Sequence, residues 1–152
     1  ALPIYADVDL ERTHFPHRDN TYMDFIYDES GRVTVNPALP KEEYEKAENL
    51  YNLVKMGRDP FGEEATSNRD FRWRTRFQTW NIAKKYLGKY EAGKSDLDDI
   101  LELVKGYGHW SIWFTVFKGH DEVRKALIEN TPGTCAACFD AGNHYEPMHR
   151  KA

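Results

Sequence analysis

The sequence predicts a mainly α fold: a helical bundle of four to five helices with a short N-terminal β-hairpin and an extended N-terminal arm. Apolar and aromatic residues recur at helical spacing over most of the chain after Pro40, and only residues 22–35 show a strand pair around a glycine turn. A chain of 152 residues suits one domain with a real core. We therefore expect an arm over residues 1–21 and a single helical domain over residues 22–152.

The arm and the hairpin differ in their sequence patterns. Residues 1–21 show neither helical nor strand periodicity and are rich in Asp, Arg, His and Pro, so they either fray or lie extended along another surface. Residues 22–27 and 32–35 are aromatic and β-branched, and the turn between them ends in Gly31, which indicates a β-hairpin. An isolated hairpin is marginal in water, so this one is expected to pack on the rest of the fold.

Two helices are predicted between residues 40 and 88. The first starts at Pro40, which suits a first helical turn, and ends at Gly57. Residues 58–67 form a predicted loop, and Asn68 can cap the second helix, which ends at Gly88. The apolar face of the first helix consists of Tyr44, Ala47, Tyr51 and Val54. The apolar face of the second consists of Trp73, Phe77, Trp80 and Leu87.

The remaining helices follow in quick succession. Ser95 and Asp98 resemble a capping box at the start of a third helix. Residues 109–118 are almost continuously apolar, which favours a buried central helix, and Asp121 starts a short helix after it. A last turn or two of helix from Gly133 is expected to hold the cysteines. The apolar face of the third helix consists of Leu97, Ile100, Leu101 and Val104.

Charge and composition limit the kinds of partner. The net charge of −4 and the isoelectric point near 5.9 argue against a nucleic-acid binder, because such proteins are normally basic. No apolar run approaches the roughly 20 residues of a membrane-spanning helix, so we expect no transmembrane segment. The protein is predicted to be soluble or peripheral to a larger, membrane-bound complex.

The start of the chain and its two cysteines bear on location. The chain begins at Ala1 with no initiator Met and no basic-then-apolar leader, which fits a mature protein after removal of a targeting peptide, although removal of a tag leaves the same start. A single cysteine pair fits an exported protein as well as a cytosolic redox or metal site. The predicted location is an exported one: the periplasm, an organelle lumen or the extracellular space.

The last eighteen residues contain four side chains that can react or bind a metal: Cys135, Cys138, His144 and His149. A disulfide between the two cysteines would close a very short loop and would only stiffen this turn. If Thr134 capped a helix, Cys135 would lie in its first turn and its pKa would be lowered, which suits thiol–disulfide exchange. All four residues together form C-x2-C-x5-H-x4-H, enough for a tetrahedral zinc site.

A fourth interpretation rests on resemblance. The run Gly133-Thr134-Cys135-Ala136-Ala137-Cys138, followed by Phe139-Asp140-Ala141, resembles the haem-attachment segment of c-type cytochromes, and its place near the end of a helical chain is similar to the cytochrome c-prime group. The resemblance implies haem c held by two thioethers from Cys135 and Cys138, with a role in electron transfer or small-ligand binding. Phe139 stands where that family has its axial His. The axial ligand would then have to come from His144, His149, Met148, His14, His17, His109 or His120.

Two further features have simpler interpretations. The arginines Arg69, Arg72, Arg74 and Arg76 lie among aromatic residues, a pattern that can bind single-stranded nucleic acid. Because the whole chain is acidic, we interpret them as a solvated face or as a dock for an acidic protein partner. His14 and His17 flank Pro16 in the arm, where surface histidines are the expected case.

These observations favour a non-catalytic subunit or binding module of a larger protein assembly, with an electron-transfer assembly as the favoured setting. The alternatives are a small c-type-haem-like electron-transfer protein or a zinc-binding module, both using Cys135 and Cys138, and a thiol–disulfide redox protein. Haem c, zinc or no cofactor at all fit the sequence. The expected partner is a protein rather than nucleic acid.

Overall fold

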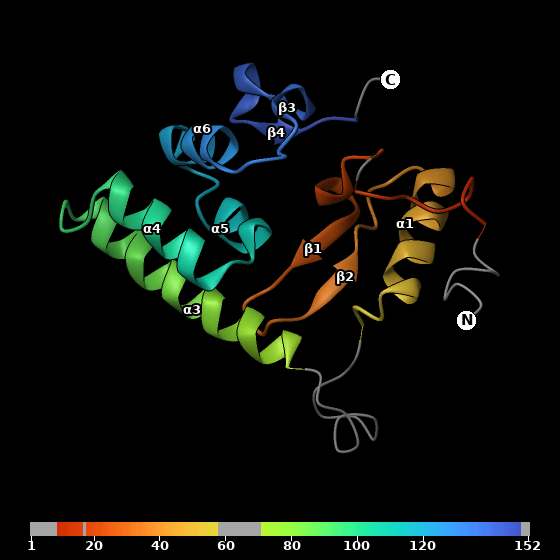
Figure 1. Ribbon diagram of the computed structural model, residues 1–152, viewed down its shortest axis with the longest axis horizontal. Helices are drawn as coiled ribbons and strands as arrows, with labels where there is room; N and C mark the ends of the chain where they lie inside the picture. The colour runs from red at the N-terminus through yellow and green to blue at the C-terminus, as the bar shows by residue number, and fades with distance from the viewer. Residues whose placement is uncertain (1–8, 17, 58–70, 150–152) are drawn as a thin grey trace.

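A computed structural model describes residues 9–16, 18–57 and 71–149 of the chain. Its five α-helices and small antiparallel hairpin in those residues confirm the predicted mainly α fold. The N-terminal hairpin and α1 form one half of the molecule, and α3 to α6 form the other (Figure 1). Within the described parts of the chain, no helix is long and apolar enough to cross a membrane.

The N-terminal hairpin is confirmed, with shorter strands than predicted. β1 (Phe25–Tyr27) pairs with β2 (Val33–Val35) in antiparallel register. A 3-10 turn, η1 (Thr21–Asp24), precedes it, because the ring of Tyr22 packs edge-on against Phe114 in the main core, 5.0 Å away between centroids. Gly31 has a φ of +83°, and a Cβ there would lie 2.5 Å from the Trp73 carbonyl oxygen. The turn therefore packs directly on α3, and only glycine fits it.

The first predicted helix is α1, Lys41–Leu53. Pro40 precedes it, as expected, but the helix ends before Gly57, and Lys55 already has a left-handed φ of 55°. The residues of α1 that face inwards meet the hairpin in a small apolar cluster of Phe25, Val33 and Leu50. This cluster fixes the hairpin on α1.

The second predicted helix is α3, Arg72–Glu91, which continues past the expected end at Gly88. The predicted apolar face is wrong for Phe77, which is 43 % exposed, whereas Trp73, Trp80 and Leu87 are partly buried. The buried side of α3 instead consists of Arg76, Thr79 and Ala83. Small side chains on this side let α3 approach the bulky rings of α5, against which it packs. Residues 58–67, Asn68 and Arg69 lie outside the described residues.

The three following helices are confirmed as α4 (Leu97–Tyr107), α5 (Trp110–Val116) and α6 (Asp121–Asn130). The capping box of α4 is formed by Asp96 and Asp99, one residue later than predicted, while the Ser95 hydroxyl donates to Asp99. α5 is the buried central helix. The main core is made of Ala83, Ile100, Trp113, Phe114, Phe117, Val123, Leu127, Ile128, Cys138 and Phe139.

The predicted C-terminal helix is wrong. Only one 3-10 turn, η2 (Ala136–Cys138), forms there, and it leads into a second hairpin of β3 (Phe139–Asp140), the 3-10 turn η3 (Ala141–Asn143) and β4 (Glu146–Pro147). So short a segment gains little from helix propagation. Burial of Phe139 in the main core instead holds the chain extended at this point.

The described part of the arm lies along α1 rather than fraying. The amide of His14 donates to the carbonyl of Lys46, 3.2 Å away, and Asn49 donates to the carbonyl of Arg12. At the other end of the arm, the side-chain amide of Asn20 donates to the carbonyls of Cys138 and Met148, both 2.9 Å away. The arm thus joins the two ends of the chain.

Candidate functional site

The two cysteines lie at the 3-10 turn η2, where the Cys138 amide donates to the Cys135 carbonyl 3.0 Å away. Cys135 is half-buried, and Cys138 is 3 % exposed within the main core. Cys135 precedes the turn, and Thr134 caps no α-helix. The first helical turn expected to lower the pKa of Cys135 is therefore not formed.

The structure separates the two histidines of the predicted zinc pattern. His144 lies in the C-terminal hairpin in a left-handed conformation, and its Nδ1 is 3.0 Å from a carboxylate oxygen of Asp121 on α6. His149 lines a cavity beside the arm, together with His14. Over residues 9–16, 18–57 and 71–149, no group of three or more His, Cys, Asp or Glu side chains could hold a metal ion. The zinc, haem, disulfide and thiol-exchange hypotheses stay predictions.

Phe139, at the position of the missing axial histidine, is a core residue. Its ring centroid lies 5.0 Å from that of Phe114 and 5.8 Å from that of Trp110. The backbone after Cys138 is thereby drawn into the aromatic core. A group attached to Cys138 would have to compete with this packing.

Arg124 holds the C-terminal hairpin in place. The residue is only 1 % exposed, and its Nε donates to the carbonyl of Phe114 at 3.0 Å. Its Nη1 donates to the carbonyl of His144 at 3.1 Å and to a carboxylate oxygen of Glu146 at 3.2 Å. The guanidinium also lies over the Phe114 ring, 4.1 Å from its centroid. The sequence offers no signal for this role, because an arginine in an amphipathic helix is usually exposed.

The predicted arginine stripe is not one continuous solvated face. Arg76 is buried, and its Nε donates to the Gly31 carbonyl at 2.7 Å, which fastens the hairpin turn to α3. Arg72 donates to the carbonyl of Val54 at 2.9 Å, at the end of α1. Arg74 is exposed and lies over the ring of Phe71. Two of the four arginines therefore connect elements of the fold.

His14 is a site residue that the sequence reasoning missed, since it is buried rather than on the surface. Its Nδ1 lies 2.9 Å from a carboxylate oxygen of Asp24, and its Nε2 lies 2.7 Å from one of Glu43. The hydrogen bond to Asp24 raises the pKa of His14, although burial acts in the opposite direction. Burial raises the pKa of the Asp24 carboxyl, and the bond from His14 opposes that rise. The three residues come from the arm, η1 and α1, so no local pattern could bring them together.

A polar cavity of 280 Å³ adjoins this cluster. Besides the three residues of the cluster, it is lined by Asp19, Asn20, Lys46 and His149. Three carboxylates, one lysine and two histidines line it, so its chemistry does not select one kind of ligand.

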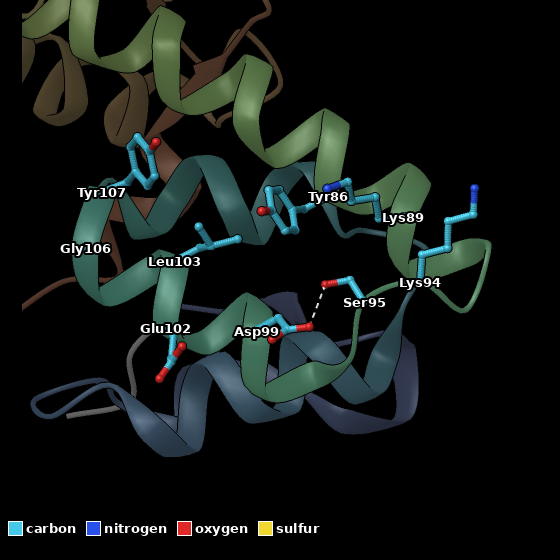
Figure 2. A pocket seen from close by; sticks show the side chains of 9 residues that line it. All are labelled: Tyr86, Lys89, Lys94, Ser95, Asp99, Glu102, Leu103, Gly106 and Tyr107. Atoms are coloured by element: carbon cyan, nitrogen blue, oxygen red, sulfur yellow. Dashed lines mark hydrogen bonds between the residues drawn. The ribbon is translucent and has the colours of Figure 1, made fainter.

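An open groove of 470 Å³ lies between α3 and α4 (Figure 2). Leu103 points into its middle, and the rings of Tyr86 and Tyr107 stand along it. Lys89 and Lys94 lie at one end, and the Lys89 ammonium is 4.8 Å from the centroid of Tyr86. The rest of the lining is Ser95, Asp99, Glu102 and Gly106.

The two sides of the groove carry different charges. α3 has six basic residues and a single acidic one, Glu91, although the whole chain has a net charge of −4. On the α4 side, the Asp99 carboxylate already accepts hydrogen bonds from the Ser95 hydroxyl and the Asp96 amide. The hydrogen bond from the backbone amide of Asp96 lowers the pKa of the Asp99 carboxyl and so keeps this carboxylate charged in the cap. Glu102 of α4 also lines the groove, so the α4 side is acidic and the positive charge of the groove lies at its lysine end.

Comparisons of the chain with models of protein families, with curated proteins and with solved structures found no match. The case for a function rests on the geometry of this molecule.

Proposed function

We propose that this protein is a non-catalytic binding module of a larger protein assembly, and that the groove between α3 and α4 receives a segment of an acidic protein partner. The observation that supports it is the composition of the groove: Leu103 in its middle, two tyrosine rings along it and two lysines at one end. Concave sites with a few convergent polar groups are the usual places for ligands.

The apolar part of the groove suits a protein side chain. Tyr107 is 46 % exposed, and tyrosines are among the residues that supply most of the binding energy in protein interfaces. Leu103, between the two tyrosine rings in Figure 2, offers an apolar contact to a side chain inserted there. Gly106 has no heavy atom within 4 Å of the position of an added Cβ, so space remains open above this turn of α4.

The basic part of the groove determines the chemistry of the partner. Lys89 and Lys94 form no ion pair with a described residue, and Lys85 lies one helical turn before Lys89 on α3. A partner segment with carboxylates at this end and an apolar side chain above Leu103 would satisfy both parts. Such complementary charge mainly governs specificity and the rate of association, and it weakens with salt.

Site-specific photocrosslinking of the full-length chain tests this proposal. A photoreactive amino acid replaces Tyr107 in the groove or, as a control, Glu129 on the exposed side of α6, and the chains are irradiated in an extract of the source cells. We expect a protein adduct from position 107 alone, with crosslinked peptides rich in Asp and Glu, and its loss at high salt. The adduct should be reproduced with the purified partner.

Two variants at one position distinguish a blocked groove from a general effect of mutation on the fold. Gly106→Trp fills the groove and should abolish the adduct, whereas Gly106→Ala leaves space and should preserve it. An adduct that survives Gly106→Trp, that forms equally from position 129, or that contains nucleic acid or a second copy of this chain would contradict the proposal.

A further inference from the structure

We propose that His14, Asp24 and Glu43 form a pH-sensitive latch, which holds the N-terminal arm on α1 while the His14 ring carries two protons and loosens the arm when one is lost. This inference is independent of the groove. It rests on the geometry of a buried imidazole between two carboxylates from two other elements.

Both ring nitrogens of His14 face carboxylate oxygens, at 2.9 Å for Nδ1 and 2.7 Å for Nε2. A carboxylate only accepts hydrogen bonds, so both contacts require an N–H on each nitrogen, and this exists only in the imidazolium cation. In the neutral ring one nitrogen presents a lone pair to a carboxylate, which is repulsive. One of the two contacts must then open.

The contact to Glu43 is the one that can open. Asp24 is 2 % exposed and would be left as a buried charge without its hydrogen bond, which is costly. Glu43 is 27 % exposed, and its other carboxylate oxygen is already 3.9 Å from the Lys46 ammonium. The neutral ring therefore keeps its proton on Nδ1 toward Asp24 and releases Glu43, which joins the arm to α1.

The charges around His14 favour the closed latch at low pH. Asp19 from its own segment, Asp24 from η1 and Glu43 from α1 all stabilise the cation, and Lys46 of α1 and His149 of the C-terminal segment line the same cavity. The bond to Asp24 is the largest of the causes that raise the pKa of His14 above 6.5.

The sign of the pH dependence follows from the direction of that shift. Because the folded-state pKa is raised, the stabilisation is fully present below pH 6.5, the unfolded value, and is lost as the pH rises through the folded-state pKa. The latch is thus closed at acidic pH and loosened at alkaline pH.

Few other contacts secure this part of the arm to α1. The Arg12 guanidinium is 3.4 Å from Glu45, but its side chain is 68 % exposed, and such surface pairs contribute little. The other contacts are the hydrogen bond from the His14 amide to the Lys46 carbonyl and the one from the Asn49 side chain to the Arg12 carbonyl. Loosening of the latch should therefore expose the backbone after Arg12.

Trypsin measures this exposure directly, since it cleaves after Arg12 and Arg18. Cleavage of the full-length protein is followed by mass spectrometry between about pH 6 and 9 and divided by cleavage of a peptide of residues 9–20, which corrects for the enzyme. We expect the corrected rate to be low near pH 6 and to rise several-fold toward pH 9, as the His14 ring loses its second proton.

Variants and a second measurement keep the test independent of folding. His14→Gln cannot become charged, so its arm should be cleaved fast at every pH. His120→Gln is the matched control, because His120 also lies between two carboxylates, Glu91 and Glu122, but has no contact with the described residues of the arm. NMR titration of the wild-type His14 ring should give a pKa above 6.5, and Glu43→Gln should lower both this pKa and the midpoint of cleavage. A His14 pKa at or below 6.5, or a corrected rate that is constant with pH, would overturn the latch.

Discussion

Arg124 on α6 and Glu146 in the C-terminal hairpin form an ion pair of 3.2 Å in which the arginine side chain is only 2 % exposed. The guanidinium also donates to two carbonyls, and it lies on the face of Phe114. This one side chain therefore joins α5, α6 and the C-terminal hairpin that follows Cys138. A charge buried so deeply is tolerated because its Nε and Nη1 both donate to acceptors, one of them a carboxylate.

Replacement of Arg124 should destabilise the protein strongly. Arg124→Met keeps an apolar stem of similar length, but it leaves the Phe114 and His144 carbonyls without these bonds. We expect a loss of about 2–4 kcal/mol in the free energy of unfolding, measured by urea denaturation with circular dichroism. Lys118→Met is the control, since Lys118 contacts the same carboxylate at 3.6 Å but is 72 % exposed. Its expected cost is about 0–1 kcal/mol, and equal costs for the two variants would refute a special role for Arg124.

Two glycines should respond to alanine in opposite directions. Gly106 lies in α4 with no atom near an added Cβ, so Gly106→Ala should stabilise the protein by about 0.5–1 kcal/mol. Gly31→Ala combines a φ of +83° with a Cβ only 2.5 Å from the Trp73 carbonyl, and we expect it to cost at least about 1–3 kcal/mol. Thermal unfolding of both variants checks this. A neutral Gly31→Ala would mean that the hairpin turn does not pack on α3.

The capping box of α4 should stabilise the protein at neutral pH and lose this effect in acid. The pKa of Asp99 is lowered, first by the hydrogen bond from the Asp96 amide and then by the one from the Ser95 hydroxyl. The stability that the charged Asp99 contributes is therefore present above the unfolded value of 3.8 and is lost as the pH falls through the folded-state pKa. Asp99→Asn should therefore flatten the loss of stability in acid. Asp98→Asn, in the same first turn but outside the capping box, should leave the acid limb unchanged. Urea denaturation between about pH 5 and 2.5 distinguishes these outcomes, and identical profiles would contradict the assignment.

The cysteine segment is best tested on the native protein. Because Cys138 and Phe139 lie in the main core, we expect no Soret band and an intact mass equal to that of the bare chain, either as two thiols or with two hydrogens lost to a disulfide. A mass excess of one haem with a Soret band would establish the cytochrome hypothesis, and zinc released by a chelator would establish the metal site. Either result would replace the non-catalytic module proposed above with an electron-transfer or metal-binding function.

Local patterns were sufficient for much of the fold. The aromatic and β-branched residues on both sides of the turn at Gly31 predict the hairpin, and the almost continuous apolar run of residues 109–118 predicts the central helix α5. The same reasoning fails for α3, where Phe77 is exposed and Arg76 is buried. The difference arises because a nearby carbonyl, that of Gly31, satisfies Arg76, and no property of α3 itself reveals that acceptor.

The candidate sites depend even more on distant contacts. The sequence concentrated attention on Cys135, Cys138, His144 and His149, but the structure pairs His144 with Asp121 and places His149 beside His14. The groove was not predicted at all, because its walls come from two helices and no pattern within either helix shows that they lie side by side.

By itself the sequence determined the class of this protein: a mainly α chain of acidic net charge, with helices whose order follows from apolar spacing and with a glycine turn between two short strands. Only the tertiary structure decided which charged side chains are buried and what they do there. His14 and Arg124 have the residue types of surface positions, and both are held inside by acceptors far along the chain, Glu43 for the first and Glu146 for the second. The physical reason is that burial of a charge depends on partners that folding brings together, whereas helix and strand formation depends on neighbours along the chain.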